Sequence, residues 1–285
     1  MNELTKIILY CAAFYLFLAV LMYIFQRRLM YMPSRNLEHP EKYGLSLQEV
    51  GFSTRDNVKI AAWFSPAQDA KETIIYFHGN LGNLGTFARH EKFRAFMDKG
   101  FGVLAVSYRG YGKSEGSPGE AGFYHDARAS LDWLIARGLP QGKMVLFGES
   151  LGTGVAVQMA IEYENIRALV LEAPYTSVLA RAKEIHWWLP VKHLLKDTFD
   201  SIGKIAGVKA PVLILHGELD RTIPVAHGRK LLAAANEPKK GVFFPHVHHI
   251  DFAPVDLARE VEVFLASDAA KNITGQAFIS MPDMR

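Results

Sequence analysis

The sequence has a single cysteine, Cys11, and almost no excess of charge of either sign. One cysteine excludes a disulfide within the chain. Its 285 residues carry 32 Lys and Arg against 29 Asp and Glu, a net charge of +3. Such a balance argues against the strongly basic surface that holds nucleic acid, so we expect no nucleic-acid partner. At 49% hydrophobic residues, the chain is long and apolar enough to bury one large core.

The sequence also lacks a complete phosphate-binding loop of the Walker type. Gly112-Lys113-Ser114 has the end of that motif, but Ser107 stands where its first glycine should be. We therefore interpret residues 107–116 as a glycine-rich loop that follows a strand.

Charge is absent from residues 7–25, a run of 19 amino acids. A helix of that length spans roughly 28 Å, close to the hydrocarbon thickness of a bilayer. A buried core helix would need a polar face, and a cleaved signal peptide would need a small-x-small site, and neither pattern is present. The sequence therefore predicts a single-pass membrane anchor within residues 1–32, which contacts the membrane through residues 7–25.

The charges that flank the run predict its orientation. Lys6 precedes the run, whereas Arg27, Arg28 and Arg35 follow it. By the positive-inside rule, the carboxyl-terminal domain is expected on the cytoplasmic side. We expect a polar linker over 33–44, a globular domain over 45–267 and a loosely ordered tail over 268–285.

Short β-branched or aromatic runs alternate with helical stretches through the globular domain, which predicts an α/β fold. The first two runs are expected to form a hairpin, and the others a mostly parallel eight-stranded sheet with helices on both faces. The expected strands are 47–54, 58–65, 73–77, 101–108, 143–148, 167–172, 211–216 and 241–245. The expected helices are 84–99, 119–137, 151–163, 226–235 and 252–266.

Residues 175–205 interrupt this alternation, because they are too long for one crossover helix. They include Trp187 and Trp188. We interpret the segment as a small helical lid, and an ordinary helix pair with core tryptophans is the alternative.

Gly148-Glu149-Ser150-Leu151-Gly152 joins an expected strand to an expected helix. Glycines on both sides of a sharp strand-to-helix turn let neighbouring backbones pass closely and leave the serine clear of them. Ser150 is therefore the candidate nucleophile, and the helix amino terminus behind it would favour a developing oxyanion.

An acid and a base are available later in the chain, in the order that this architecture requires. The loop after residues 211–216 carries Asp220, the preferred acid, and Glu218, the alternative. The loop after the last strand carries His246, His248 and His249. We select His249 as the base because it is furthest along the loop, with His248 as the second choice.

The same histidine cluster permits another interpretation, in which it binds a metal. His246, His248, His249 and Asp251 are all possible ligands. No partner cluster stands elsewhere in the sequence, and a metal site would leave Ser150 and the acid without a role. We therefore expect neither a metal nor another cofactor.

An oxyanion needs two hydrogen-bond donors beside the nucleophile. The backbone N–H of Leu151 is the first candidate, since it directly follows Ser150. The second should come from the loop after residues 73–77, where His78-Gly79 allows a tight turn that faces the Asn80 N–H inward. His78 itself is expected to be structural.

Together these motifs resemble the α/β-hydrolase superfamily. The resemblance covers residues 45–267 and the anchor. Within the superfamily, the sequence is similar in particular to membrane-anchored serine hydrolases with an amino-terminal helix, a group that resembles eukaryotic protein depalmitoylases and includes many bacterial members. In such relatives the last motif reads Gly-x-His-x-Asp, which aligns with His249 and Asp251, but here Val247 replaces the glycine. The motifs that carry the resemblance lie at 78–80, 107–116, 148–152, 216–224 and 248–251.

The expected function is that of a membrane-anchored serine hydrolase. Ser150 would attack an acyl ester or thioester, His249 would transfer the proton, and Asp220 would orient the imidazole. A serine peptidase and a non-catalytic membrane scaffold on the same fold are the alternatives.

Overall fold

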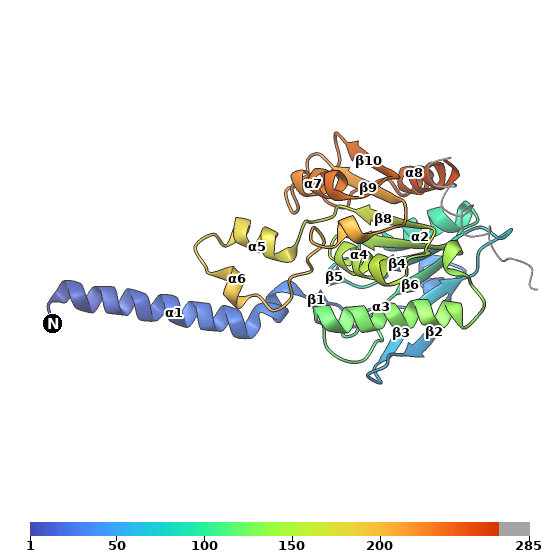
Figure 1. The fold of residues 1–285 in the computed structure, drawn as a ribbon. Coiled ribbons are helices and arrows are strands. Elements are labelled where there is room, and N and C mark those ends of the chain that lie inside the picture. The colour runs from blue at the N-terminus through green and yellow to red at the C-terminus, as the bar shows by residue number, and fades with distance from the viewer. Residues whose placement is uncertain (268–285) are drawn as a thin grey trace, which may run out of the picture.

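An eight-stranded sheet runs through the centre of the structure, a computed structural model that describes residues 1–267 (Figure 1). The predicted tail, 268–285, lies outside the described residues. The sheet confirms the predicted α/β class with a mostly parallel eight-stranded sheet. In sheet order its strands are β10 (Lys239–Phe244), β9 (Val212–Gly217), β8 (Ala168–Glu172), β7 (Met144–Glu149), β4 (Thr73–Phe77), β6 (Gly102–Val106), β3 (Lys59–Ser65) and β2 (Gln48–Ser53).

Six neighbouring strands, β10 through β6, are parallel, and β3 and β2 are antiparallel to their neighbours. The central strands are buried along their whole length. In β4, for example, all five residues of the run 73–77 are buried, as in a strand that is covered on both faces. The β2–β3 hairpin turns at Asn57, whose φ of 58° lies in the left-handed region that asparagine tolerates. Because parallel strands end at one edge, the loops after β4, β7 and β9 converge there.

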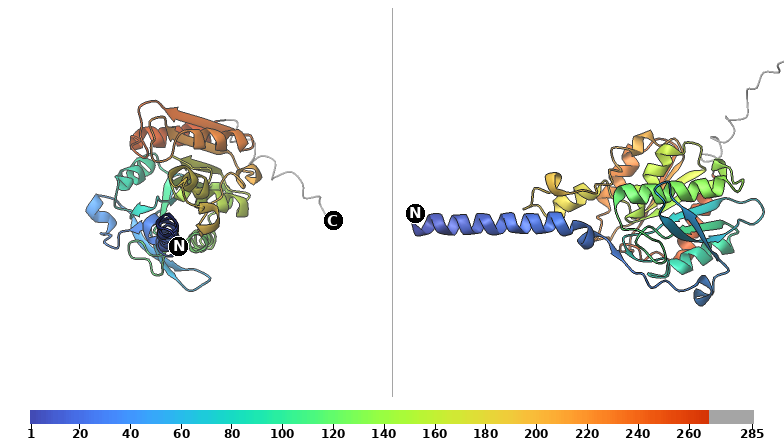
Figure 2. Two further views of the ribbon diagram at one scale, coloured as in Figure 1. Left: turned by 90° about the vertical axis from the view of Figure 1, so that its left-hand side faces the viewer. Right: turned by 90° about the horizontal axis from the view of Figure 1, so that it is seen from below.

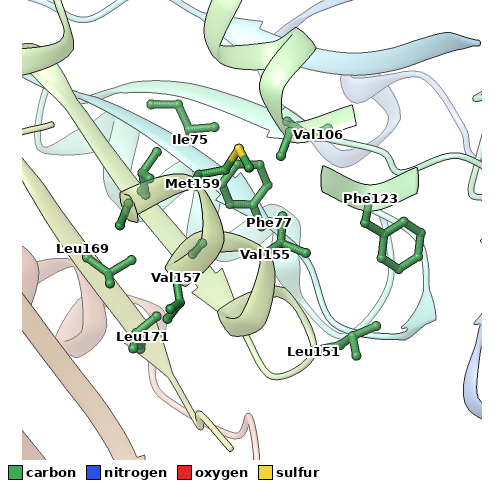
Figure 3. Close-up of a cluster of buried hydrophobic side chains, with 14 of the residues drawn as sticks. Ile75, Phe77, Val106, Phe123, Leu151, Val155, Val157, Met159, Leu169 and Leu171 are labelled. Carbon is green, nitrogen blue, oxygen red and sulfur yellow. The ribbon is translucent and has the colours of Figure 1, made fainter. Parts of the chain in front are cut away.

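Helices cover both faces of the sheet, as predicted. One face packs against α3 (Glu120–Ile135), α4 (Gly152–Glu162) and α7 (Ala226–Ala234), and Figure 3 shows part of this core around α4. The other face packs against α2 (Arg89–Asp98) and α8 (Pro254–Ala266). Short 3₁₀ turns occur at Pro40–Tyr43, Gln141–Lys143 and Ile205–Gly207.

The amino terminus forms one long helix, α1 (Glu3–Met30), which projects away from the sheet (Figure 2). Asn2 caps it by accepting a hydrogen bond from the Thr5 N–H at 2.8 Å. Among the described residues, α1 is the helix that is long and apolar enough to cross a membrane. Its large apolar side chains are mostly exposed, so α1 is not a buried helix of the core.

Residues 33–44 lie against the globular domain. Strand β1 (Met32–Pro33) pairs in parallel with β5 (Leu81–Gly82), and Leu37 is buried. The Asn83 side chain donates to the carbonyls of Ser34 and Asn36, at 3.3 and 2.8 Å. Part of the predicted polar linker is therefore held against the domain by hydrogen bonds to the loop after β4.

The segment that interrupts the alternation forms two short helices, α5 (Val178–Ile185) and α6 (Val191–Leu194), beside α1 (Figure 1). Ser177 caps α5 by accepting from the Ala180 N–H. Trp187 is 83% exposed and Trp188 41% exposed, so neither tryptophan belongs to the core. From here on, "lid" denotes residues 175–205.

Candidate active site

Ser150 occupies a sharp turn between β7 and α4. Its φ of 50° is in the left-handed region, which is uncommon for a residue with a side chain. Its N–H donates to the Glu172 carbonyl at 2.8 Å, which ties the turn to the neighbouring strand β8. A Cβ on Gly152 would overlap the Phe77 carbonyl, and one on Gly148 would overlap α4. Glycine is therefore required on both sides for α4 to pass so close to the sheet.

His249 lies on the loop between β10 and α8, and its imidazole joins two of the predicted residues. Its Nε2 is 2.8 Å from Ser150 Oγ, and its Nδ1 is 2.7 Å from Asp220 Oδ2. Because a carboxylate can only accept, Nδ1 carries the proton and Nε2 is left to accept from the serine hydroxyl. The structure thus connects Ser150, His249 and Asp220 through two hydrogen bonds.

Asp220 is buried and surrounded by donors. Its Oδ1 accepts from the N–H groups of Thr222 and Ile223, both at 2.8 Å. Burial alone opposes ionisation, but the hydrogen bonds from His216 and His249 outweigh it, so the pKa of Asp220 lies below its usual value. The carboxylate is therefore ionised throughout the neutral range, as an imidazole partner requires.

His216, to which the sequence motifs gave no role, lies near the end of β9 and contacts Asp220. Its Nε2 lies 2.9 Å from the Ile223 carbonyl and 3.3 Å from Asp220 Oδ2. Two acceptors at one nitrogen place the proton there, so His216 donates toward the carboxylate. Its position four residues before Asp220, near the end of a strand, is the feature of the sequence that could have indicated this contact.

The alternative residues lie elsewhere. Glu218 pairs with Arg229 at 2.5 Å, on the surface. His248 is exposed, with Nδ1 3.1 Å from the Leu219 carbonyl, and His246 is also exposed. Within residues 1–267, no group of three or more His, Cys, Asp or Glu side chains is arranged to hold a metal ion.

The two predicted oxyanion donors lie beside Ser150. The N–H groups of Asn80 and Leu151 have no acceptor within the described part of the chain, and both residues line the same cavity as Ser150. Backbone N–H groups that face a nucleophile without an acceptor can donate hydrogen bonds to an oxyanion, which is the arrangement that acyl transfer uses.

Asn80 is also tied to the end of α1. Its side-chain amide donates to the Met30 carbonyl at 2.8 Å, and its own carbonyl accepts from the Met32 N–H at 3.2 Å. The Tyr111 hydroxyl donates to the same carbonyl at 2.6 Å. Asn80 is thus held partly by the residues through which the amino-terminal helix joins the domain.

His78 precedes this loop and is fully buried. Its ring packs against Tyr108 and Tyr111, with centroids 4.5 and 4.9 Å away. Burial, aided by the nearby Arg89 charge, lowers the pKa of His78 to about 3. Its Nδ1 lies 2.7 Å from the Gly79 carbonyl, so the neutral ring donates there and supports the turn.

A buried ionic cluster, which the sequence motifs did not indicate, lies beneath the turn. Glu149 lies 2.7 Å from Arg89 and 3.0 Å from Lys92, and Lys92 lies 2.6 Å from Glu172. All four side chains are at most 2% exposed. Burial favours a neutral Glu149, but the two cations outweigh it and lower its pKa. Glu149 also accepts from the Gly79 N–H at 3.2 Å, which links the cluster to the Asn80 loop.

A cavity of about 340 Å³ adjoins Ser150, Asn80 and Leu151. Most of its remaining lining is apolar and comes from the lid and from α1. A serine that is hydrogen-bonded through an imidazole to a carboxylate, with two backbone N–H groups and an apolar cavity beside it, can bind an acyl group and transfer it.

Comparison with known proteins agrees with this architecture. The family model described as alpha/beta hydrolase fold matches residues 72–201. The Mycobacterium tuberculosis protein Rv2307c, named as uncharacterized, is 38% identical over an alignment that covers 81% of this chain and 84% of that protein. The Arabidopsis thaliana alpha/beta hydrolase domain-containing protein WAV2 is 32% identical, with 81% of this chain and 83% of WAV2 covered.

Among solved structures, the Pyrococcus furiosus esterase Pf2001 superposes with a TM-score of 0.67 at 21% sequence identity. The superposition covers 82% of this chain and 98% of the esterase. At that identity the similarity concerns the fold. The sequence relatives, the family model and the eight-stranded sheet lead to one conclusion: this chain belongs to the α/β-hydrolase family.

Proposed function

We propose that the protein is a membrane-anchored serine hydrolase that cleaves carboxylic esters or thioesters. The observation that carries the proposal is the pair of hydrogen bonds, at 2.8 and 2.7 Å, that joins Ser150 through His249 to Asp220, beside the N–H groups of Asn80 and Leu151. The esterases among the structural neighbours add support, since they have the same fold.

In the acylation step, Ser150 Oγ attacks the substrate carbonyl carbon while His249 Nε2 takes the hydroxyl proton. The carbonyl oxygen becomes an oxyanion, which accepts from the N–H groups of Asn80 and Leu151. Asp220 stabilises the imidazolium. When the intermediate collapses, the bond to the alkoxide or thiolate breaks, and the leaving group receives the proton from His249.

In the deacylation step, water attacks the acyl-serine and gives its proton to His249 Nε2. A second tetrahedral intermediate forms in the same oxyanion site and collapses to the carboxylic acid. His249 then returns the proton to Ser150 Oγ, which restores the enzyme. The cycle needs only residues of this chain and one water molecule.

The cavity supports an acyl chain as the part of the substrate that is recognised. Its lining is predominantly apolar, and it begins at the serine that would carry the acyl group. An ester and a thioester place the same carbonyl at Ser150, so the cavity favours neither leaving group.

The proposed anchor is α1, with the hydrolase domain on the cytoplasmic side. The length and apolar character of α1 support a membrane span. Arg27 and Arg28 in its last turn support the orientation, since basic residues concentrate on the cytoplasmic side.

The proposal is tested with the purified full-length protein in detergent and a series of p-nitrophenyl esters and acyl thioesters from two to sixteen carbons. We expect turnover of both classes in wild type and none above background in Ser150→Ala. Cleavage of peptide amides in preference to esters would instead favour a peptidase. A folded protein that turns over none of these substrates would favour a scaffold.

A further inference from the structure

The amino-terminal helix forms one wall of the cavity beside Ser150. Met22, Gln26, Leu29 and Met30 of α1 line it. Their spacing of four, three and one residues places them on one face of the helix. The segment that is apolar enough to cross a membrane is therefore also part of the cavity that would receive the acyl chain.

The lid forms the opposite wall. Ile185, Leu189 and Leu194 line the cavity. Leu189 also packs with Ala19 and Met22 of α1 in a separate small apolar cluster. The cavity thus continues from the serine into the space between two elements that contact each other through apolar side chains.

Polar contacts fix which face of α1 is turned toward the lid. Arg27 donates twice to the buried Asp197 carboxylate, at 2.7 and 2.8 Å, and the Tyr31 hydroxyl donates to it at 3.0 Å. The Gln26 side chain donates to the Leu194 carbonyl at 3.0 Å. A bidentate pair of this kind has a defined geometry, so the rotation of α1 about its axis is set by the lid.

The tip of the lid lies alongside the apolar run of α1. The Tyr15 hydroxyl donates to the Trp188 carbonyl at 3.0 Å, and the two rings meet edge to face. Tyr15 lies twelve residues before Arg27, which corresponds to about 18 Å along a helix. Figure 2 shows the lid helices against the part of α1 nearest the domain.

Exposed apolar side chains gather at the same tip. Trp187, Ile185 and Trp188 are 83%, 51% and 41% exposed. Tyr15 lies near the middle of the uncharged run 7–25, ten residues before its carboxyl end. If α1 crosses a membrane through that run, the tip beside Tyr15 lies within the leaflet nearest the domain, where exposed apolar side chains contact hydrocarbon rather than water.

We propose that the substrate is a long-chain acyl ester or thioester that resides in the bilayer, and that its acyl chain enters the cavity sideways between α1 and the lid. The inference rests on the proposed serine hydrolase function. The chain would pass from hydrocarbon to an apolar cavity without exposing its methylene groups to water, which is the route that the hydrophobic effect favours.

The route is tested with the full-length protein reconstituted in phosphatidylcholine vesicles that contain p-nitrophenyl palmitate. Tenfold dilution with buffer lowers the bulk concentration of the ester but not its mole fraction in the bilayer. We expect the rate per enzyme to stay within twofold after that dilution and to fall about tenfold when the ester is diluted tenfold with lipid. A tenfold fall on dilution with buffer would overturn the proposal.

The contribution of α1 to the acyl-binding cavity is tested by Met22→Trp, because a larger side chain at this position would fill the cavity from the α1 side. The matched control is Ile24→Trp, since Ile24 is 57% exposed and is not among the lining residues. We expect the ratio of rates on p-nitrophenyl palmitate and p-nitrophenyl acetate to fall at least tenfold in Met22→Trp and to stay within twofold in Ile24→Trp. An unchanged ratio in Met22→Trp would overturn the inference.

If the serine hydrolase proposal itself is wrong, the measurements differ from those expected when only the acyl route is wrong. In that case wild type hydrolyses neither ester, and a fluorophosphonate probe does not label Ser150. If wild type hydrolyses the acetate and is labelled, the serine hydrolase assignment stands whatever the palmitate measurements show.

Discussion

Glu149→Gln is expected to destabilise the protein strongly, although the two side chains have the same shape. In the folded protein Arg89 and Lys92 both face the Glu149 carboxylate, at 2.7 and 3.0 Å, and are removed from water. Removal of one partner from a buried ion pair leaves an uncompensated charge, which costs about 3–5 kcal/mol.

Glu172 reduces that loss. Burial, together with the Glu149 charge, raises the pKa of Glu172 in the wild type, despite the opposing effect of Lys92. Without the Glu149 charge, this pKa should fall, and the resulting carboxylate would balance Lys92 but not Arg89. We therefore expect the low end of the range, about 3 kcal/mol. For a chain of this size that corresponds to a fall in Tm of roughly 6–12 °C.

The assay is thermal unfolding of the full-length protein in detergent, followed by tryptophan fluorescence. Glu262→Gln is a matched control, because Glu262 also faces two cations, Lys71 and Lys99, at 3.1 and 2.6 Å, but is 37% exposed. A surface pair of this kind contributes about 1 kcal/mol or less. Equal shifts in Tm for the two variants would show that burial does not increase the contribution of the Glu149 cluster to stability.

Three further predictions concern the turn and the residues around it. Asp220→Asn should lower kcat on a soluble ester by about 10³–10⁴-fold at nearly constant KM, because the amide cannot hold His249 in the same tautomer; a loss below tenfold would contradict the assigned role. The pKa of His78, lowered to about 3 by burial, means that between pH 6.5 and 3 only the unfolded chain gains this proton, so stability falls as the pH falls. In urea unfolding at pH 7, 6 and 5, the free energy of unfolding of His78→Gln should depend less on pH than that of wild type, by up to about 1.4 kcal/mol per pH unit. An equal pH dependence in the two proteins would contradict a lowered pKa for His78. Gly152→Ala should lower Tm and slow labelling of Ser150 by a fluorophosphonate probe, since its Cβ overlaps the backbone of β4, whereas Gly142→Ala meets nothing closer than 3.9 Å and should do neither.

The sheet could be predicted from sequence because its strands are marked by local pattern. Residues 73–77 form a short β-branched and aromatic run between Lys71-Glu72 and His78-Gly79, and the strand is buried throughout. Helix boundaries were less certain. The helix expected at 84–99 begins only at Arg89, because Phe87 and Ala88 have positive φ values of 55° and 54° that no composition pattern indicates.

The three residues that the motifs selected as nucleophile, acid and base lie together because each follows the end of a strand, and parallel strands end at one edge. The Glu149 cluster could not be predicted in this way. Arg89 and Lys92 are three residues apart on one helix face, and charges at that spacing usually point to solvent. Their burial depends on Glu149 and Glu172, which come from distant strands.

The role of α1 in the cavity could not be predicted either. Hydropathy identifies the apolar run, but it does not say which face of the helix meets the lid. That face is set by Arg27 and Tyr31, whose common partner Asp197 is far along the sequence. The two-residue pairing of β1 with β5 is also too short to produce a periodic pattern.

The proposed function requires Ser150 to be a nucleophile that His249 activates. The most direct test is labelling of the purified protein by a fluorophosphonate probe in wild type, Ser150→Ala, His249→Ala and His248→Ala. We expect labelling of wild type and His248→Ala, and loss of labelling in the other two variants. Labelling that persists in Ser150→Ala, or its absence from folded wild type, would contradict the claim.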